Sequence, residues 1–151
     1  MRARHGVALL RIALGVLFLV AAWPKLVDPQ GFAQSISNYR LVPVPVERVL
    51  ALVLPPLELL VGLCLVLGVL DAGASLVVLG LMVVFTAAVG AALARGLDIS
   101  CGCFDTAGGP KVGWTKLAEN LVLTFASVWV AFGDRSWLSL TSWLGRSGDI
   151  E

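Results

Sequence analysis

The sequence predicts an all-α integral membrane protein, folded as a single four-helix transmembrane bundle over residues 1–151. Apolar residues make up 58% of the 151 positions and charged residues only 14%, whereas soluble domains carry about 25% charged residues. With a mean hydropathy of +0.92, the chain has too few polar side chains to cover a surface that faces water. Its apolar residues lie in long continuous runs, which are typical of membrane helices rather than of alternating barrel strands.

The composition also argues against two other classes of protein. Disordered chains have low hydrophobicity, which is the opposite of what this chain shows. Nucleic-acid binding normally needs a basic patch, and this chain has a net charge of +1 without a dense run of Lys or Arg. We therefore expect the lipid membrane as the surroundings of the chain and no nucleic acid as a partner.

Four apolar runs are each long enough to cross a hydrocarbon core of ~30 Å at about 1.5 Å per residue. They cover residues 7–27, 49–70, 74–94 and 114–132. The first run could also be a signal peptide, but it is longer than a usual apolar signal region, so we expect it to remain. Proline and polar residues in 28–46 predict a loop with a short interfacial helix around Phe32–Tyr39. Asp71–Gly73 predicts a tight turn before the third run.

An even number of spans places both chain ends on the same side of the membrane. The numbers of Lys and Arg on the two sides of the membrane show no clear bias, so we take the orientation from the residues that flank the first span. Arg2 and Arg4 precede that span and favour cytoplasmic N- and C-termini, in a bacterial inner membrane. The loop 95–113 then faces the oxidising extracytoplasmic side, where disulfides persist.

This loop carries the sharpest motif of the chain, Cys101–Gly102–Cys103–Phe104–Asp105. Two thiols that are one residue apart close a disulfide only with backbone strain, which glycine tolerates best. A strained and exposed disulfide exchanges readily with other thiols. Cys101 and Cys103 are therefore the candidate catalytic residues. Cations close to a sulfur favour the thiolate, and the loop and its helix ends supply Arg95, Lys111 and Lys116.

Two other roles for the cysteine pair stay open at this point. A permanent link between Cys101 and Cys103 would shape the loop so that it docks a partner without catalysis. The pair could also ligate a soft metal such as Cu(I) or Zn²⁺. The single histidine, His5, is expected on the opposite face, so a complete set of metal ligands is not evident and we predict no metal.

Glu58 is the only charged residue of the second run, and it follows Pro55–Pro56. A charge near the middle of a bilayer costs about 2.5–3.5 kcal/mol, so Glu58 must be paired or protonated. Lys25 at the end of the first run and Lys116 in the fourth are its candidate partners. Such a pair is either a polar clasp between helices or a site that handles protons or quinone beneath the loop.

Two further features of the apolar runs are expected to serve packing. Cys64 lies about 15 residues into the second run, ~20 Å from the side that holds the cysteine loop, so we expect a buried apolar thiol. Small residues in the second and third runs suit close contact between helices, namely Gly62, Gly68, Gly80 and Gly90.

Taken together, these residues resemble the MauE branch of the DoxX-like membrane proteins over roughly residues 7–132. The resemblance rests on several short matches and is most specific at the cysteine loop. The matches are Arg11, Leu14–Gly15, Pro24–Lys25–Leu26, Phe32, Tyr39, Pro56-x-Glu58, Gly62, Cys101–Gly102–Cys103–Phe104 and Trp114. The sequence departs from the family pattern at Asp105 and Glu119, where glycine and arginine are usual.

The resemblance implies a membrane partner in thiol–disulfide chemistry that works with a thioredoxin-like extracytoplasmic protein. It also implies an architecture similar to DsbB and vitamin K epoxide reductase, in which a quinone lies between four helices. We therefore predict a thiol–disulfide oxidoreductase or relay at Cys101 and Cys103, with quinone or the thiol–disulfide pair of a second protein as electron acceptor. The predicted supporting residues are Gly102, Phe104, Asp105, Lys25, Glu58, Lys111 and Trp114. A non-catalytic docking subunit and a Cu- or Zn-binding subunit are the alternatives.

Overall fold

The computed structural model describes residues 2–101 and 111–133, and within these ranges the regular structure is helical apart from one isolated bridge. There are five helices: α1 (Arg2–Val27), α2 (Pro29–Asn38), α3 (Val44–Leu67), α4 (Asp71–Ala94) and α5 (Trp114–Phe132). The all-α class is therefore confirmed for the described part of the chain. The predicted interfacial helix also exists as α2, and it begins at Pro29 rather than at Phe32.

Three of these helices are long and apolar enough to cross a membrane, which makes the chain a multi-pass membrane protein by length and composition. The three candidate spans are Gly6–Val27, Val44–Leu67 and Ala72–Ala94. Helix α5 has the bounds predicted for the fourth span, but it is not among these three. It is 19 residues long and carries Lys116, Glu119 and Asn120 in its first two turns.

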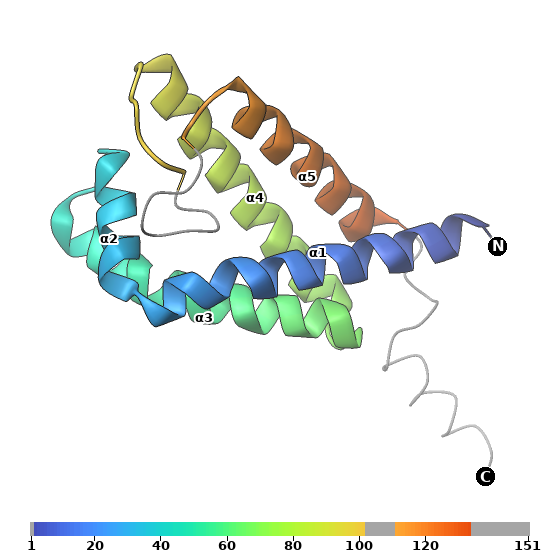
Figure 1. Ribbon diagram of the computed structural model, residues 1–151. Helices are drawn as coiled ribbons and strands as arrows, with labels where there is room; N and C mark the ends of the chain where they lie inside the picture. The colour runs from blue at the N-terminus through green and yellow to red at the C-terminus, as the bar shows by residue number, and fades with distance from the viewer. Residues whose placement is uncertain (1, 102–110, 134–151) are drawn as a thin grey trace, which may run out of the picture.

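Helices α1 and α3 run side by side in opposite directions (Figure 1). They approach most closely where Gly15 faces Gly62. A Cβ atom added to Gly15 would lie 2.8 Å from the carbonyl oxygen of Gly62, and one added to Gly62 would lie 2.9 Å from that of Gly15. Since real Cβ contacts are not that short, the crossing requires glycine on both helices. The packing role predicted for Gly62 is confirmed, whereas a Cβ on Gly80 would meet nothing within 4 Å.

The turn between α3 and α4 lies at Gly68–Leu70, so the prediction of a turn at Asp71–Gly73 is wrong. Gly68 ends α3 in the left-handed region at φ 69°, which glycine adopts without a steric penalty. Asp71 is the first residue of α4. At its other end α3 begins at Val44 rather than Val49, because proline is well tolerated just inside a helix start.

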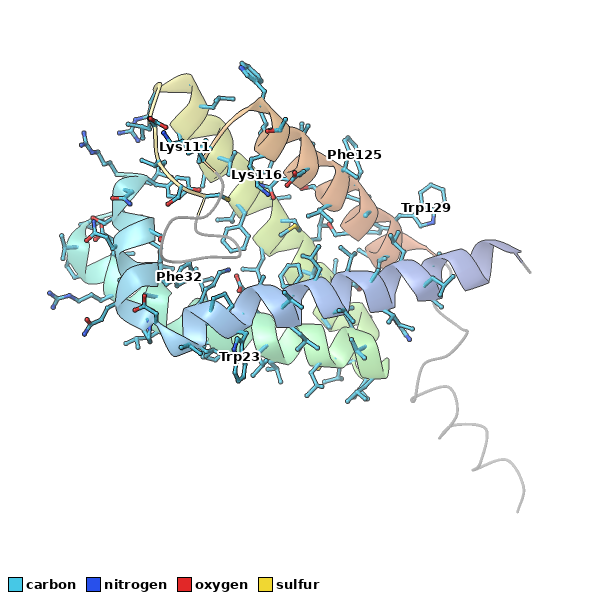
Figure 2. All side chains as sticks on the ribbon, viewed as in Figure 1. Trp23, Phe32, Lys111, Lys116, Phe125 and Trp129 are labelled. Atoms are coloured by element: carbon cyan, nitrogen blue, oxygen red, sulfur yellow. The ribbon has the colours of Figure 1, made fainter. Side chains whose placement is uncertain are left out.

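Helices α4 and α5 form a second antiparallel pair, which contacts the first pair through α3 and α1. In Figure 1 the two pairs diverge from the end that holds the N-terminus toward the end that holds α2. Where the pairs meet, buried side chains from α1, α3, α4 and α5 form the main core, including Leu14, Phe18, Val61, Leu65, Val78, Met82 and Val130. Trp23, Phe125 and Trp129 lie on the outer faces of the helices (Figure 2), as expected for side chains that face lipid.

Helix α2 fills part of the space at the divergent end. Its start is fixed by Asp28, whose side chain accepts a hydrogen bond from the backbone N–H of Gly31 at 2.9 Å. Phe32 and, just after the helix, Tyr39 are both buried. The segment that was predicted as an interfacial loop therefore contributes two aromatic side chains to the interior of the bundle.

Candidate functional site beneath the cysteine loop

A buried ion pair joins α1 to α3. Lys25 Nζ donates hydrogen bonds to both carboxylate oxygens of Glu58, at 2.7 and 2.8 Å, and the two side chains are only 3% and 1% exposed. The same Nζ lies 4.9 Å from the ring centre of Phe32 and 5.3 Å from that of Phe85. Aromatic faces attract a cation, so both rings support the ammonium group. The predicted Lys25–Glu58 pair is confirmed, while Lys116 pairs with Glu119 on its own helix.

Cys101 lies in a second buried cluster near the end of α4. The cysteine is disulfide-bonded and 6% exposed, and it packs with Tyr39, Val89 and Ala92. The hydroxyl of Tyr39 donates a hydrogen bond of 2.9 Å to the backbone carbonyl of Cys101. The expectation of an exposed disulfide is therefore wrong for Cys101, because Tyr39 and α4 cover it.

Cys64 is a free, half-buried thiol that packs against the main core between the four long helices. Its cluster is distinct from the one that contains Cys101. This agrees with the expectation of an apolar packing residue remote from the loop, although the thiol is half-buried rather than buried as predicted. Cys64 is thus not a partner of the Cys101 disulfide.

The two ends of the cysteine loop are held together at its base. Ser100 and Lys111 form an antiparallel bridge, and the N–H of Val112 donates to the carbonyl of Ile99 at 2.8 Å. On the α4 side, Arg95 Nη1 donates to the carbonyl oxygen of Tyr39 at 2.9 Å. Hydrogen bonds therefore tie α4, the segment after α2 and the loop into one unit. The predicted site residues Gly102, Cys103, Phe104 and Asp105 lie outside the described residues.

A cavity of about 190 Å³ lies between the diverging helix pairs and connects the two features. Its wall is largely apolar, and it also includes Lys25, Glu58, Tyr39, Cys101 and Asn120. Asn120 is 8% exposed, and its Nδ2 has no hydrogen-bond partner among the described residues. The cavity thus brings together the ion pair, the disulfide-bonded cysteine and an unsatisfied amide group.

Two other predicted supporting residues lie away from this cavity. Lys111 pairs with Asp98 at 2.8 Å, and both side chains are more than two thirds exposed, at 71% and 72%. Trp114 is the first residue of α5 and is 77% exposed. Neither residue lines the cavity. Within the described ranges, no three His, Cys, Asp or Glu side chains gather where they could hold a metal ion.

Comparison with known protein families matches residues 4–133 to the model of methylamine utilisation protein MauE. The chain belongs to the MauE family. MauE of Paracoccus denitrificans is 38% identical over 125 residues, which cover 82% of this chain and 67% of that protein. MauE of Methylorubrum extorquens is 38% identical over 81% of this chain, and MauE of Paracoccus versutus is 37% identical over 76%.

These MauE proteins are longer than the chain described here. The matched regions cover 67%, 66% and 62% of the three relatives, so the chain spans about two thirds of their length. No solved structure matches the chain. The family assignment is consistent with the resemblance drawn from the cysteine loop and the Pro56-x-Glu58 pattern.

Sequence reasoning missed two features of this MauE-family site. Asn120 received no role, although an amide within a mostly apolar helix is a recognisable signal in a membrane protein. Tyr39 was expected at the end of a short interfacial helix, and the structure places its hydroxyl against the backbone carbonyl of Cys101. The contact joins residues 62 positions apart, so local sequence pattern does not reveal it.

The environment of Tyr39 predicts an unusual alkaline titration. Burial disfavours the phenolate and raises the pKa of Tyr39 to about 12 from the ordinary 10.0. Because the folded-state pKa is raised, the stabilisation by the neutral phenol is complete below about pH 10 and is lost as the pH rises through about 12. The chain has one tyrosine, so tyrosinate absorbance reports this group alone. We expect a midpoint near 12, no signal in Tyr39→Phe, and a midpoint near 10 if Tyr39 were exposed.

Proposed function

We propose that this MauE-family chain is a membrane thiol–disulfide relay whose redox pair is Cys101 and Cys103. The observation that carries the proposal is that Cys101 is disulfide-bonded and lies in the wall of the cavity that contains Lys25 and Glu58. Cys103 is the proposed disulfide partner, because Cys64 is free and the chain has three cysteines. The cysteine pair would then connect the loop, which contacts a partner protein, with the cavity inside the bundle.

The burial of Cys101 suggests the order of the exchange. A thiolate of a thioredoxin-like partner would attack the sulfur of Cys103, because Cys101 is only 6% exposed. That attack breaks the bond between Cys101 and Cys103, forms a mixed disulfide, and releases Cys101 as a thiolate. The second thiolate of the partner then attacks the partner's own sulfur in the mixed disulfide and frees Cys103. The partner loses two electrons and two protons, and the cysteine pair gains them.

Reoxidation of the pair needs an acceptor of two electrons and two protons. We propose a lipid-soluble quinone for this role, with a second protein disulfide as the alternative acceptor. The support is the position of Cys101 at a largely apolar cavity within a membrane protein. Lys25 and Glu58 line the same cavity and share hydrogen bonds at 2.7 and 2.8 Å, so they are the proposed groups that move charge or protons.

The relay also requires a defined topology. We propose that α5 is a fourth span, because it packs antiparallel to α4 and exposes apolar side chains, among them Val122, Phe125, Trp129 and Phe132. Four spans place both termini on the same side, which we propose to be the cytoplasmic side of a bacterial inner membrane, with the cysteine loop on the extracytoplasmic side. A thioredoxin-like partner would then meet the loop in an oxidising compartment.

A trapping experiment tests the relay. The protein is reconstituted in lipid nanodiscs with Cys64→Ala as background, and either Cys101→Ser or Cys103→Ser is added. The probe is a thioredoxin variant that keeps only one of its active-site cysteines. That cysteine is first converted to a mixed disulfide with thionitrobenzoate, so that a free thiol can displace the thionitrobenzoate. We expect the free thiol of Cys103 to form a covalent complex at least about tenfold faster than that of Cys101, because burial limits access to Cys101. Thionitrobenzoate release and a gel shift measure both rates.

The same experiment decides between the relay and a non-catalytic docking subunit. The docking role is favoured by the burial of Cys101 and by the hydrogen bond from Tyr39, both of which suit a rigid structural link. If neither thiol captures the probe faster than a protein that keeps only Cys64, the relay is rejected and the docking role is supported. If Cys101 reacts faster than Cys103, the proposed order of attack is wrong.

A further inference from the structure

We propose that the cavity beneath Cys101 is a binding site for a ring-sized apolar molecule that offers a carbonyl oxygen to the side-chain amide of Asn120. The inference rests on the proposed relay only where it identifies this molecule with the electron acceptor. Binding itself depends on the cavity and on Asn120, and it needs no disulfide chemistry.

The first argument is the unsatisfied amide. Asn120 is only 8% exposed, and it lines the cavity. Its Nδ2 atom has no hydrogen-bond partner in the described part of the chain. Buried polar atoms are nearly always hydrogen-bonded, since leaving one unpaired is costly. An Nδ2 atom carries two N–H donors and no acceptor. The missing partner is therefore a hydrogen-bond acceptor, which we assign to a molecule that enters the cavity.

The second argument is the size and lining of the cavity. Its volume is about 190 Å³, and an apolar protein cavity of about 150 Å³ is large enough to bind benzene. The wall is built mainly from large apolar side chains, including Leu17, Phe18, Leu54, Met82, Phe85 and Leu123. Ordered water needs two to four polar partners, which a wall of this kind does not offer over most of its area. One substituted six-membered ring suits both the volume and the lining.

The third argument concerns charge and access. The ammonium of Lys25 is matched by Glu58, so the wall adds no net charge, and a neutral ligand is expected. The wall also includes Leu41 and Val84, which are 48% and 62% exposed, so the cavity reaches the surface of the protein. Val84 lies on a span, within Ala72–Ala94. A neutral apolar ligand can therefore enter from the bilayer.

Two sources supply a carbonyl oxygen on an apolar molecule in a membrane: a quinone ring and the ester group of a phospholipid. The test places the purified protein in nanodiscs of either ester-linked or ether-linked phospholipid and titrates decylubiquinone by calorimetry, with melting temperature as a second measurement. Asn120→Leu removes the amide with little change of volume. Ser127→Ala is the matched control, because Ser127 is a buried polar residue of the same helix that does not line the cavity.

We expect decylubiquinone to bind the wild-type protein and the Ser127→Ala variant equally. Asn120→Leu should weaken binding about tenfold, the loss expected for one hydrogen bond to a buried donor. Without ligand, Asn120→Leu should melt no lower than Ser127→Ala, because it removes an unpaired group. If instead the lipid ester is the ligand, the wild-type protein melts higher in ester than in ether nanodiscs, and Asn120→Leu abolishes this difference. Either result supports a carbonyl-binding site at Asn120, and only the first supports a ring as the ligand.

The proposal is overturned if Asn120→Leu leaves decylubiquinone binding and the ester–ether difference unchanged. It is also overturned if the variant melts well below Ser127→Ala with unchanged binding, because Asn120 would then serve the fold. The relay and the cavity fail separately in these tests. If no thiol captures thioredoxin but decylubiquinone binding still depends on Asn120, the relay is rejected and the binding site is kept. If thioredoxin is captured but binding does not depend on Asn120, only the binding site is rejected.

Discussion

Lys25→Met should destabilise the protein by about 3–5 kcal/mol, the cost expected when one partner of a buried ion pair is removed. The carboxylate of Glu58 is 1% exposed and receives both of its hydrogen bonds from Lys25. Without the ammonium group, Glu58 must either remain as an uncompensated charge or take up a proton in an apolar interior. Reversible unfolding in detergent micelles at neutral pH measures the change in the free energy of unfolding.

The chain offers a matched control in its exposed pair, Lys111–Asp98. Its nitrogen–oxygen distance of 2.8 Å is close to that of the buried pair, but the side chains are 71% and 72% exposed. Water and salt screen such a pair, so Lys111→Met should cost less than about 1 kcal/mol. If Lys25→Met and Lys111→Met cost the same, the buried position assigned to the Lys25–Glu58 pair is incorrect.

The double substitution Lys25→Met and Glu58→Leu separates the two roles that this pair could have. Replacing a buried ion pair by apolar residues of similar volume is often neutral or stabilising, so most of the lost stability should return. If the pair is a clasp alone, the folded double variant reoxidises its cysteine pair at the wild-type rate. If the pair moves charge or protons, the double variant is stable but slow in reoxidation.

The ion pair could be predicted from the sequence because lipid leaves few solutions for a charge. Glu58 lies within the second apolar run, and Lys25 lies at the end of the first. The second run begins on the side of the membrane where the first run ends, so the two residues can meet. Because an unpaired charge in lipid is costly, this placement is enough to predict that Lys25 pairs with Glu58. The length of an apolar run also predicted α5 correctly at 114–132, whereas α3 begins at Val44 rather than at Val49.

The rest of the site depends on how helices rotate and diverge, and a local pattern does not determine this. The burial of Cys101 follows from Tyr39, which reaches the loop from the segment after α2. Asn120 faces the cavity only because α5 packs against α4 in one particular rotation. The position of the α3–α4 turn was also missed, because Gly68 could equally have served a helix contact, as Gly62 does.

Gly62→Leu should destabilise the protein by at least about 1–3 kcal/mol, the usual cost of overpacking. The new Cβ would lie 2.9 Å from the backbone carbonyl oxygen of Gly15 and 3.2 Å from the side chain of Leu19. A backbone atom cannot yield as the end of a flexible side chain can, so α1 and α3 must separate. Gly80→Leu is the control, because a Cβ there meets nothing within 4 Å and leucine favours a helix more than glycine does. Its measured effect should be neutral or stabilising.

The same substitution tests whether the glycine crossing positions the ion pair. Glu58 lies one helical turn before Gly62 on α3, so a separation of the helices there should also move Glu58 away from Lys25. Residues that share one structural arrangement are not additive in their effects on stability. Lys25→Met should therefore cost less in the Gly62→Leu protein than in the wild type, whereas its cost should be unchanged in the Gly80→Leu protein. Full additivity with Gly62→Leu would mean that the α1–α3 crossing stabilises the bundle without setting the geometry of the pair.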